Sequence, residues 1–246
     1  MDGPADRART LLREARRAVA FTGAGVSTAS GIPDFRSPGG IWTRYRPVSF
    51  DEFLASDEGR RRYWRYKRET FAAFAGARPN AAHHALAGLE AEGRLLAVVT
   101  QNIDGLHQEA GSRQVVELHG TNREVACLGC GRSEPAGPVM SRADIPTCDA
   151  CGGWLKPATI SFGQNLRPEV LEEAFRLARA CDLMLVLGSS LLVYPAAAVP
   201  EAALERGAAL VVVNQEPTPL DEAAAAVLHG RVEELLPPLV GWEGDG

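Results

Sequence analysis

The chain contains the run Ala18-Val19-Ala20-Phe21-Thr22-Gly23-Ala24-Gly25, in which a short apolar segment passes directly into a pair of glycines. A buried strand that ends in a glycine loop opens the dinucleotide-binding α/β fold, because glycine lets the backbone approach a pyrophosphate closely. An amphipathic helix is expected just before it, over residues 5–17. The same pattern also fits a glycine turn that binds no ligand, so this loop alone does not decide the function.

The glycine loop departs from the dehydrogenase pattern at two points. Thr28 stands where the third glycine of GxGxxG is expected. Residues 38–48 show neither a strand pattern nor the acidic residue that holds the adenosine ribose in nicotinamide-dependent dehydrogenases. The sequence therefore disfavours hydride transfer.

Apolar runs and alanine-rich stretches alternate along the rest of the chain. We expect buried strands at residues 95–100, 183–187 and 210–213, and helices at residues 81–92, 169–180 and 196–206. This alternation predicts a parallel sheet. The alanine tract at residues 223–226 is interpreted as helical.

Two segments interrupt this alternation, residues 39–78 and residues 126–155, and both are predicted to be insertions that form a smaller domain. The first contains a basic and aromatic run at residues 60–68, which fits binding of nucleic acid or of an acidic partner. We favour a helix whose aromatic residues, together with Phe71 and Phe74, pack inward while its cations face solvent.

Four cysteines form two matched pairs, Cys127-x-x-Cys130 and Cys148-x-x-Cys151, with 17 residues between the pairs. This spacing is typical of a zinc site with four thiolates, which leaves no open position for water and is therefore structural. A redox dithiol is the alternative, and a zinc ribbon can also dock nucleic acid or protein. Cys181 is expected to be an inert buried thiol.

Polar side chains follow the predicted strand at residues 95–100, beginning with Gln101 and Asn102. Open α/β sheets place ligand chemistry at the carboxyl ends of their strands, although a capped turn into a helix has the same composition. Among five histidines, His119 is the best candidate for a general base, whereas His83, His84 and His229 resemble structural residues.

Composition restricts the class of protein. The chain has 246 residues, 46% of them hydrophobic and 23% charged, which is typical of globular proteins rather than of disordered or membrane proteins. A formal net charge of -5 gives no overall nucleic-acid footprint, so nucleic acid is not an expected partner. Neither a signal peptide nor a membrane span is recognisable, so we expect a cytoplasmic protein without a membrane partner.

Taken together, these motifs resemble the sirtuin family in order and spacing over nearly the whole chain. The matching residues are Gly23-Ala24-Gly25-Val26-Ser27-Thr28-Ala29-Ser30-Gly31-Ile32-Pro33-Asp34-Phe35-Arg36-Ser37, Gln101-Asn102-Ile103-Asp104, His119-Gly120, the two CxxC pairs, Gly188-Ser189-Ser190 and Val213-Asn214. The composition, rich in arginine and alanine, suggests a bacterial source.

The resemblance implies an α/β fold with a Rossmann-type parallel sheet as the large domain, and a smaller domain made of a helical module and a zinc ribbon. The large domain would comprise residues 1–38, 79–125 and 156–246, the helical module residues 39–78, and the zinc ribbon residues 126–155. The implied activity is NAD-dependent deacetylation of protein lysines. The acyl oxygen would attack the nicotinamide ribose of NAD, a consumed co-substrate, giving nicotinamide, O-acyl-ADP-ribose and free lysine.

The resemblance also implies roles for the matching residues. The catalytic residues would be His119 as general base, Asn102 and Asp104. NAD would be bound by Gly23, Ala24, Gly25, Ser27, Thr28, Asp34, Phe35, Arg36, Gln101, Asn102, Ile103, Asp104, Gly188, Ser189, Ser190, Asn214 and Val232. The acetylated-lysine substrate would contact Ile160, Phe162 and Gly163, and one structural Zn²⁺ would be held by Cys127, Cys130, Cys148 and Cys151. Backbone N–H groups of Gly23, Ala24 and Gly25 are expected to bind the phosphates.

The chain departs from the family pattern at two places. Gln164 replaces a frequent glutamate after Phe162-Gly163, and Arg65 stands where members that prefer succinyl or malonyl groups carry the tyrosine of Tyr-x-x-Arg, ending here at Arg68. We therefore favour acetyl or another neutral acyl group, with acidic acyl groups left open. Mono-ADP-ribosyl transfer to protein and a non-catalytic, NAD-sensing docking module are the alternative functions.

Overall fold

The structure of the chain is a computed structural model, which describes residues 3–34, 46–142 and 144–244. Its large domain is built on a sheet of six parallel strands in the order β3-β2-β1-β7-β8-β9. These strands are β1 (Ala18–Thr22), β2 (Leu95–Thr100), β3 (Val115–Glu117), β7 (Leu183–Leu187), β8 (Ala209–Asn214) and β9 (Ala226–His229). The strand order reverses at β1, so the loops after β1 and β7 meet at a switch point, where open α/β sheets bind their ligands.

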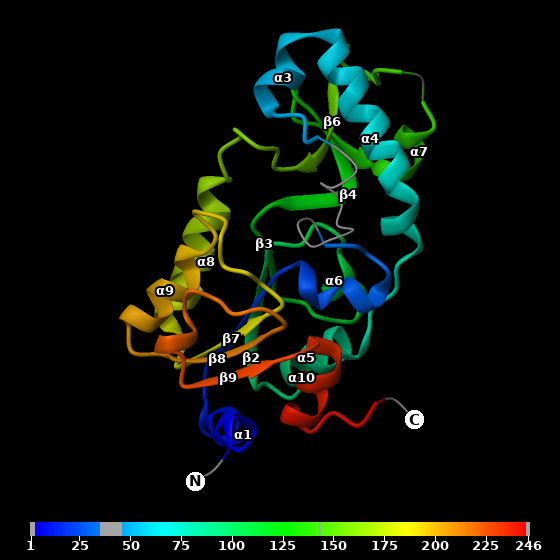
Figure 1. The fold of residues 1–246 in the computed structure, drawn as a ribbon. Coiled ribbons are helices and arrows are strands. Elements are labelled where there is room, and N and C mark those ends of the chain that lie inside the picture. The colour runs from blue at the N-terminus through cyan, green and yellow to red at the C-terminus, as the bar shows by residue number, and fades with distance from the viewer. Residues whose placement is uncertain (1–2, 35–45, 143, 245–246) are drawn as a thin grey trace.

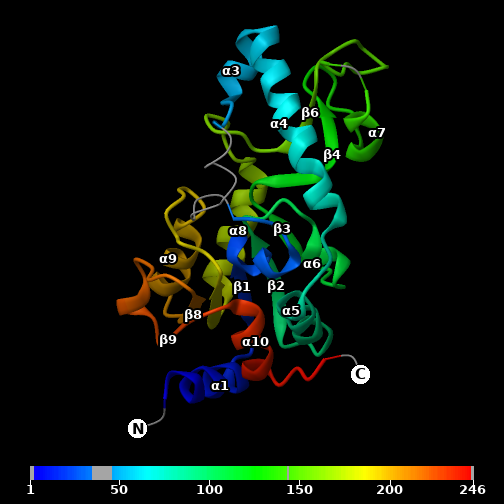
Figure 2. The ribbon, with the colours of Figure 1, turned by 45° about the vertical axis from the view of Figure 1, so that its right-hand side comes forward.

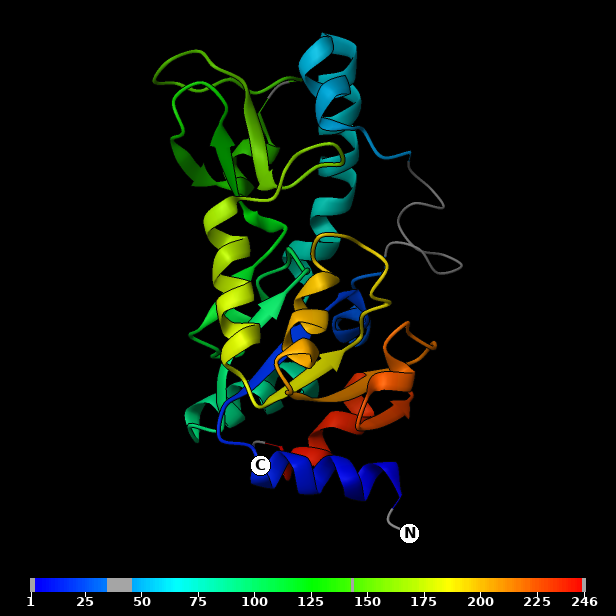
Figure 3. The ribbon, with the colours of Figure 1, turned by 90° about the vertical axis from the view of Figure 1, so that its left-hand side faces the viewer.

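Helices cover both faces of this sheet, which is why its strands are continuous apolar runs. One face packs against α1 (Pro4–Glu14), α5 (Ala81–Ala91) and α10 (Val232–Val240), and the other against α8 (Pro168–Ala180) and α9 (Ala198–Glu205). Alternate residues of β1 point to the two faces, with Ala20 in the first core and Phe21 in the second. In Figure 3 the yellow-green α8 runs from the small domain down along the large sheet.

The small domain lies at one end of the molecule (Figures 1 and 2), and α1 and α10 lie at the other. In the described residues it contains an antiparallel sheet in the order β5-β4-β6 and the helices α3, α4 and α7. Its elements are α3 (Phe50–Ala55), α4 (Asp57–Gly76), β4 (Gly120–Cys127), β5 (Ser133–Pro135), α7 (Ala136–Met140) and β6 (Leu155–Thr159). The predicted α/β fold with a parallel sheet and a smaller domain is therefore confirmed.

Short elements complete the described chain: η1 (Ala24–Val26), η2 (Thr28–Ser30), α6 (Leu106–Glu109) and η3 (Asp221–Ala223). Among the described helices, none is both long enough and apolar enough to cross a bilayer. The predicted strands at residues 95–100 and 183–187 coincide with β2 and β7. The first helix ends earlier than expected, at Glu14, because the backbone N–H groups of Arg16 and Arg17 donate to the Asp182 carboxylate.

The helical interpretation of residues 223–226 is wrong. The backbone is already extended at Ala224, and Ala226 opens β9. Ala226 pairs with Val211 of β8, so pairing at the edge of the sheet overrides the helical preference of alanine.

The basic run at residues 60–68 is helical, as predicted, and lies in α4. Tyr63 and Trp64 pack into the core of the small domain. The prediction that all cations of this run face solvent is wrong for Arg60 and Lys67, which are buried. The guanidinium of Arg60 donates to the Phe53 and Leu54 carbonyls and lies 3.7 Å from the centre of the Trp154 ring, so these contacts replace its hydration.

Candidate active site

A cleft of about 1330 Å³ lies along the carboxyl ends of β1, β2, β7 and β8, below the small domain. Loops from both domains line this cleft, so a ligand bound in it would contact groups from several elements. The predicted site residues that line it are Gly23, Ala24, Gly25, Thr28, Asp34, Gln101, Asn102, Ile103, His119, Ile160, Phe162, Gly163, Gly188, Ser189, Ser190 and Asn214.

Three described residues that were predicted to bind NAD do not line the cleft, and two further ones cannot be placed. Ser27 and Asp104 are buried and are not part of the cleft lining; the Ser27 hydroxyl links the Asn102 amide to the Asp104 carboxylate. Val232 is packed in the core at the start of α10 and is not part of the cleft lining. Phe35 and Arg36 lie outside the described residues.

The glycine loop after β1 packs backbone against backbone with the loop after β7. A Cβ atom on Gly25 would lie 2.8 Å from the Gly188 Cα, and one on Gly23 would lie 2.7 Å from the Gly188 oxygen. The N–H of Gly23 donates to the Leu187 carbonyl and that of Gly25 donates to the Gly188 carbonyl. Both N–H groups are used within the protein, so the prediction that they bind a phosphate is wrong. The two glycines instead allow the close approach of the two loops.

Asn102 is held rigidly at the end of β2. Its side-chain amide donates to the Gly23 carbonyl at 3.1 Å and to the Ser27 hydroxyl oxygen at 3.0 Å, while its backbone N–H donates to Thr100 Oγ1. The Ser27 hydroxyl in turn donates to the Asp104 carboxylate at 2.8 Å. Since both N–H donors of the amide are used within the protein, its carbonyl oxygen is the group of Asn102 that is left to contact a ligand.

Burial raises the pKa of Asp104, against the lowering effect of its hydrogen bonds from the Leu106 backbone N–H and the Ser27 hydroxyl. The carboxylate lies behind Asn102 and holds Ser27 in place. Asp104 is therefore a positioning residue in this structure.

His119 follows β3 and precedes β4. Its Nδ1 lies 3.0 Å from the Gln101 carbonyl oxygen, which accepts only a hydrogen bond, so the ring nitrogen there carries the proton. This contact leaves Nε2 as the basic nitrogen of the neutral ring. Gly120 follows in a left-handed conformation with a φ of 70°, and a Cβ there would lie 2.0 Å from the Ala158 oxygen, so only glycine lets β6 pass this close.

The predicted substrate segment is tied to His119 through its backbone. The N–H of Ile160 donates to the His119 carbonyl at 2.8 Å, and the Phe162 carbonyl accepts from the N–H of Phe50. The Gln164 side-chain oxygen accepts from the N–H of Ser161 at 3.2 Å. The amide at position 164 thus closes the turn in place of the glutamate that is frequent there.

The four cysteines of the CxxC pairs form a compact cluster, in which all sulfur atoms lie within 4.8 Å of one another. The sulfur atoms of Cys127 and Cys151 are 3.5 Å apart, and those of Cys130 and Cys148 are 3.8 Å apart. Zinc–sulfur bonds of about 2.3 Å require sulfur atoms about 3.8 Å apart in a tetrahedron, so the geometry fits Zn²⁺.

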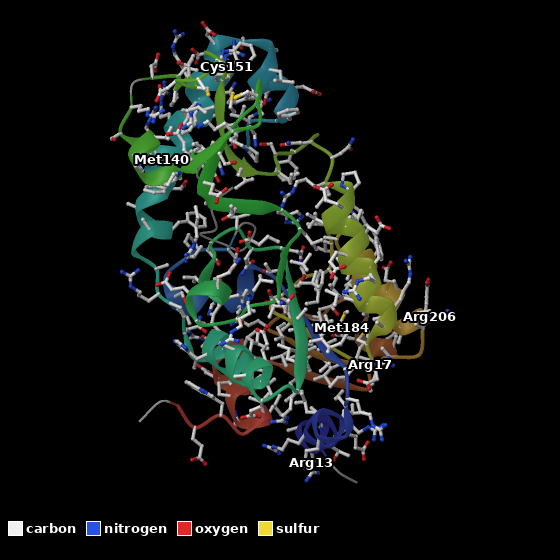
Figure 4. All side chains as sticks on the ribbon, turned by 180° about the vertical axis from the view of Figure 1, so that it is seen from behind. Arg13, Arg17, Met140, Cys151, Met184 and Arg206 are labelled. Atoms are coloured by element: carbon white, nitrogen blue, oxygen red, sulfur yellow. The ribbon has the colours of Figure 1, made fainter. Side chains whose placement is uncertain are left out.

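Backbone donors support thiolate ligands in this cluster. The N–H groups of Cys130 and Gly129 donate to Sγ of Cys127 and lower the pKa of its thiol to about 6. Figure 4 shows Cys151 at the opposite end of the molecule from Arg13 of α1, in the zinc ribbon and away from the large sheet. The four-cysteine geometry and its distance from the large sheet are consistent with the predicted structural role of the zinc ribbon.

Comparison with known proteins places the chain in a family. A model of the Sir2 family matches residues 23–195. The chain is 48% identical over 241 residues to NAD-dependent protein deacetylase 1 of Bradyrhizobium diazoefficiens, and the alignment covers 96% of this chain and 95% of that protein. The chain belongs to the Sir2 family. A second relative, an NAD-dependent protein deacetylase of Rhodopseudomonas palustris, is 46% identical over 237 residues, covering 94% of each chain.

Solved Sir2 structures have the same fold. One with a deacetylated p53 peptide and 3′-O-acetyl-ADP-ribose matches with a TM-score of 0.88 at 41% identity, covering 96% of both chains. Another with a p53 peptide and NAD⁺ matches with a TM-score of 0.86 at 40% identity, covering 94% of this chain and 95% of that chain. The predicted membership of the sirtuin family is confirmed.

Two buried histidines of this Sir2 chain lie beneath the glycine loop. The rings of His83 and His107 are 4.8 Å apart, Nε2 of His107 lies 3.0 Å from Thr22 Oγ1, and Nε2 of His83 lies 3.5 Å from Ser27 Oγ. Burial lowers the pKa of His83 to about 2 and that of His107 to about 4. Both rings are therefore neutral near pH 7 and shape the floor of the site, which leaves His119 as the histidine of the cleft.

Sequence reasoning missed several residues of the cleft. Leu192 and Tyr194, in the loop after β7, line it and are each 63% exposed. Their position shortly after Gly188-Ser189-Ser190, at the carboxyl end of a buried strand, was a signal that could have found them. Tyr63 and Lys67 of α4 also line the cleft, but nothing in a basic aromatic helix indicates which of its cations turns inward.

Proposed function

We propose that this Sir2 protein is an NAD-dependent protein-lysine deacetylase. The observation that carries the proposal is the convergence of the glycine loops, Asn102 and His119 on one cleft, together with a segment suited to an extended peptide. The names of its relatives support the same activity.

The pyrophosphate of NAD would lie where the loops after β1 and β7 meet. Since the N–H groups of Gly23 and Gly25 are used within the protein, we assign the phosphates to the Ala24 N–H and the hydroxyl of Ser189. The Ser189 hydroxyl is oriented by Gln101, whose side-chain amide donates to it at 2.8 Å. The adenosine end would extend towards Asn214, whose side-chain amide donates to the Glu216 carbonyl and shapes that loop.

The nicotinamide ribose would lie beside Asn102 and His119. The oxygen of the acetyl-lysine attacks the anomeric carbon as the bond to nicotinamide breaks, and nicotinamide leaves with the bonding electrons. Nε2 of His119 then takes a proton from a ribose hydroxyl, which attacks the former acetyl carbon. Addition of water and cleavage of the bond to nitrogen release free lysine and O-acetyl-ADP-ribose.

The peptide would bind beside the segment from Ile160 to Gly163. Phe162 is 49% exposed, and Leu192 and Tyr194 flank the same cleft, so a substrate finds apolar contacts on both sides of its lysine. Backbone pairing with such a segment recognises an extended chain largely independently of its side chains. The proposed substrates are accordingly acetylated lysines of proteins or peptides.

We also propose that the protein works in the cytoplasm. Four clustered thiols serve zinc only while they stay reduced, and the cytoplasm keeps thiols reduced.

Replacement of His119 tests the proposed catalytic role. His119→Ala is expected to lower kcat for deacetylation by about 100- to 10,000-fold, the usual contribution of a general base. The readouts are nicotinamide release and deacetylation of an acetyl-lysine peptide. His84→Ala is the matched control and is expected to keep its activity, because the His84 ring stacks on Trp242 and is not part of the cleft lining. Full turnover by His119→Ala with zinc and fold intact would remove His119 from the proposed role.

A further inference from the structure

Arg123 links β4 of the small domain to the loop that follows β2 of the large sheet. It lies three residues after Gly120, the first residue of β4. Its Nε donates to the backbone carbonyl oxygen of Asp104 at 3.2 Å, and its Nη2 donates to the Glu109 carboxylate at 2.7 Å. One guanidinium therefore joins the beginning of β4 to the loop that carries Asn102.

Gly105 leaves the space in which this guanidinium lies. The residue is buried and has a left-handed backbone with a φ of 70°, and a Cβ on it would lie 2.0 Å from Nε and 2.7 Å from Cζ of Arg123. A side chain at position 105 would therefore displace the guanidinium from the Asp104 carbonyl. An exposed ion pair alone holds two segments together weakly, because water competes for both charges. The contact with the backbone thus places Arg123 more firmly than its pair with Glu109 does.

Two further hydrogen bonds join the same two segments. Nδ1 of His119 lies 3.0 Å from the Gln101 carbonyl oxygen, and the backbone N–H of Asn122 donates to the Ile103 carbonyl at 2.8 Å. The contact of Arg123 continues this series by one residue on each side. Together the three contacts hold the loop after β2 against the beginning of β4.

The charge of Arg123 also acts on Asn102 through Asp104. Burial raises the pKa of Asp104, and the effects that oppose it are the hydrogen bonds from Leu106 and Ser27 and then the charge of Arg123. The ionised carboxylate accepts from the Ser27 hydroxyl, whose oxygen accepts from the Asn102 amide. Arg123 therefore favours the charge state of Asp104 that keeps Asn102 oriented.

We propose that Arg123 is a positioning residue for acyl transfer, which holds Asn102 and His119 in the relative placement that both need at one ribose. The inference rests on the proposed deacetylase function and adds a residue to its machinery. No step of the reaction changes, because Arg123 acts through the segments that carry the reacting groups.

The two stages of the reaction are expected to respond differently to loss of Arg123. Cleavage of the bond to nicotinamide depends on NAD bound by loops of the large sheet. The later proton transfer needs Nε2 of His119 within about 2.6–3.2 Å of a ribose hydroxyl, so it depends on how the loop after β2 meets the beginning of β4. Loss of Arg123 should therefore slow acyl transfer more than cleavage of the bond to nicotinamide.

The full chain, given NAD and an acetyl-lysine peptide, allows the two stages to be measured separately. Exchange of labelled nicotinamide into NAD reports cleavage of the nicotinamide bond and its reversal, whereas formation of O-acetyl-ADP-ribose reports the whole reaction. Arg123→Ala is expected to lower kcat for O-acetyl-ADP-ribose formation by about 10-fold relative to nicotinamide exchange, since a small misplacement of a proton acceptor is costly. The KM for NAD is expected to stay unchanged, because Arg123 is not part of the cleft lining.

Two further variants distinguish the contact with Asp104 from a general loss of charge. Arg61→Ala removes a similarly exposed arginine of the small domain, whose ion pair with Asp144 has the same length of 2.7 Å, and both rates are expected to stay unchanged. Glu109→Gln keeps the contact between Arg123 and the Asp104 carbonyl, so it is expected to lower acyl transfer less than Arg123→Ala does.

Gly105→Ala disturbs the same contact from the other side. Because the added Cβ displaces the guanidinium, this variant is expected to lower the ratio of acyl transfer to nicotinamide exchange in the wild-type background but not in Arg123→Ala. Such non-additivity is expected when two changes remove one contact. Additive losses would assign the effect to backbone strain at position 105 and would contradict the inference.

Amide hydrogen exchange of the ligand-free protein tests Arg123 independently of activity. We expect residues 101–106 to exchange faster in Arg123→Ala than in the wild type or in Arg61→Ala, with thermal unfolding as the check on overall fold. If the wild type neither exchanges nicotinamide nor deacetylates the peptide, the proposed function fails, while the amide exchange still tests Arg123. Unchanged protection of residues 101–106 in Arg123→Ala, or equal losses of nicotinamide exchange and acyl transfer, would overturn the inference.

Discussion

At the scale of single residues, hydrogen bonds orient the side chains of Asn102, Ser27 and His119. Ser27 accepts from the Asn102 amide and donates to Asp104, and the Gln101 carbonyl fixes the tautomer of His119. The sequence pattern placed Asn102 and His119 in the cleft correctly but could not show that Asp104 lies behind it. A position in a motif identifies a residue, whereas the direction of its side chain depends on contacts with distant parts of the chain.

The buried histidines predict that the protein loses stability in acid. The pKa of His107 is lowered from 6.5 to about 4 in the folded chain, so the unfolded chain binds more protons below pH 6.5. Its contribution to stability is therefore present above pH 6.5 and is lost as the pH falls towards 4. Between pH 7 and pH 5 this amounts to about 2 kcal/mol.

The variant His107→Gln removes this titration and keeps a side chain able to reach Thr22. Urea unfolding at pH 7 and pH 5 should show a smaller loss of unfolding free energy in the variant than in the wild type. The same loss in both proteins would show that His107 is not responsible for the acid sensitivity.

At the scale of elements, the close approach of the loops after β1 and β7 is the feature on which the site depends. The apolar runs of the sheet were predictable from sequence, because strands buried on both faces need continuous apolar residues. The strand β9 was not predictable, since it follows an alanine tract that favours a helix and forms only through pairing with β8. The inward turn of Lys67 was also hidden, because periodicity within α4 does not reveal which side meets the cleft.

Gly25→Ala tests the contact between the two loops. The added Cβ would lie 2.8 Å from the Gly188 Cα, so the loops must separate. We expect a loss of about 1–3 kcal/mol in unfolding free energy and a raised KM for NAD. Gly76→Ala, at the end of α4 where a Cβ meets nothing within 4 Å, is the matched control and should be neutral or slightly stabilising. An unchanged KM in Gly25→Ala would separate this contact from NAD binding.

At the scale of the whole molecule, the two domains contribute different parts of the cleft. The large sheet supplies the glycine loops and Asn102, while the small domain closes the cleft with α4 and begins β4 one residue after His119. Both the zinc ribbon and the sheet were predictable from spacing and periodicity. Their relative placement was not, because it depends on packing between segments far apart in sequence.

Removal of zinc is expected to act on the small domain rather than directly on the chemistry. The metal fits four thiolates that leave no open position for substrate, so a strong chelator should lower the melting temperature and activity together. Cys148→Ser is expected to have the same effect without chelator, and readdition of Zn²⁺ should restore only the chelated wild type. Activity that survives complete loss of zinc with an unchanged melting temperature would contradict a structural role.

We expect NAD to be consumed as the co-substrate of deacetylation. The most direct test follows NAD labelled in its adenosine moiety during reaction of the purified protein with an acetyl-lysine peptide. Nicotinamide, deacetylated peptide and labelled O-acetyl-ADP-ribose are expected to form in equal amounts. Label attached to protein would indicate ADP-ribosyl transfer, and intact NAD alongside unchanged peptide would contradict the catalytic account.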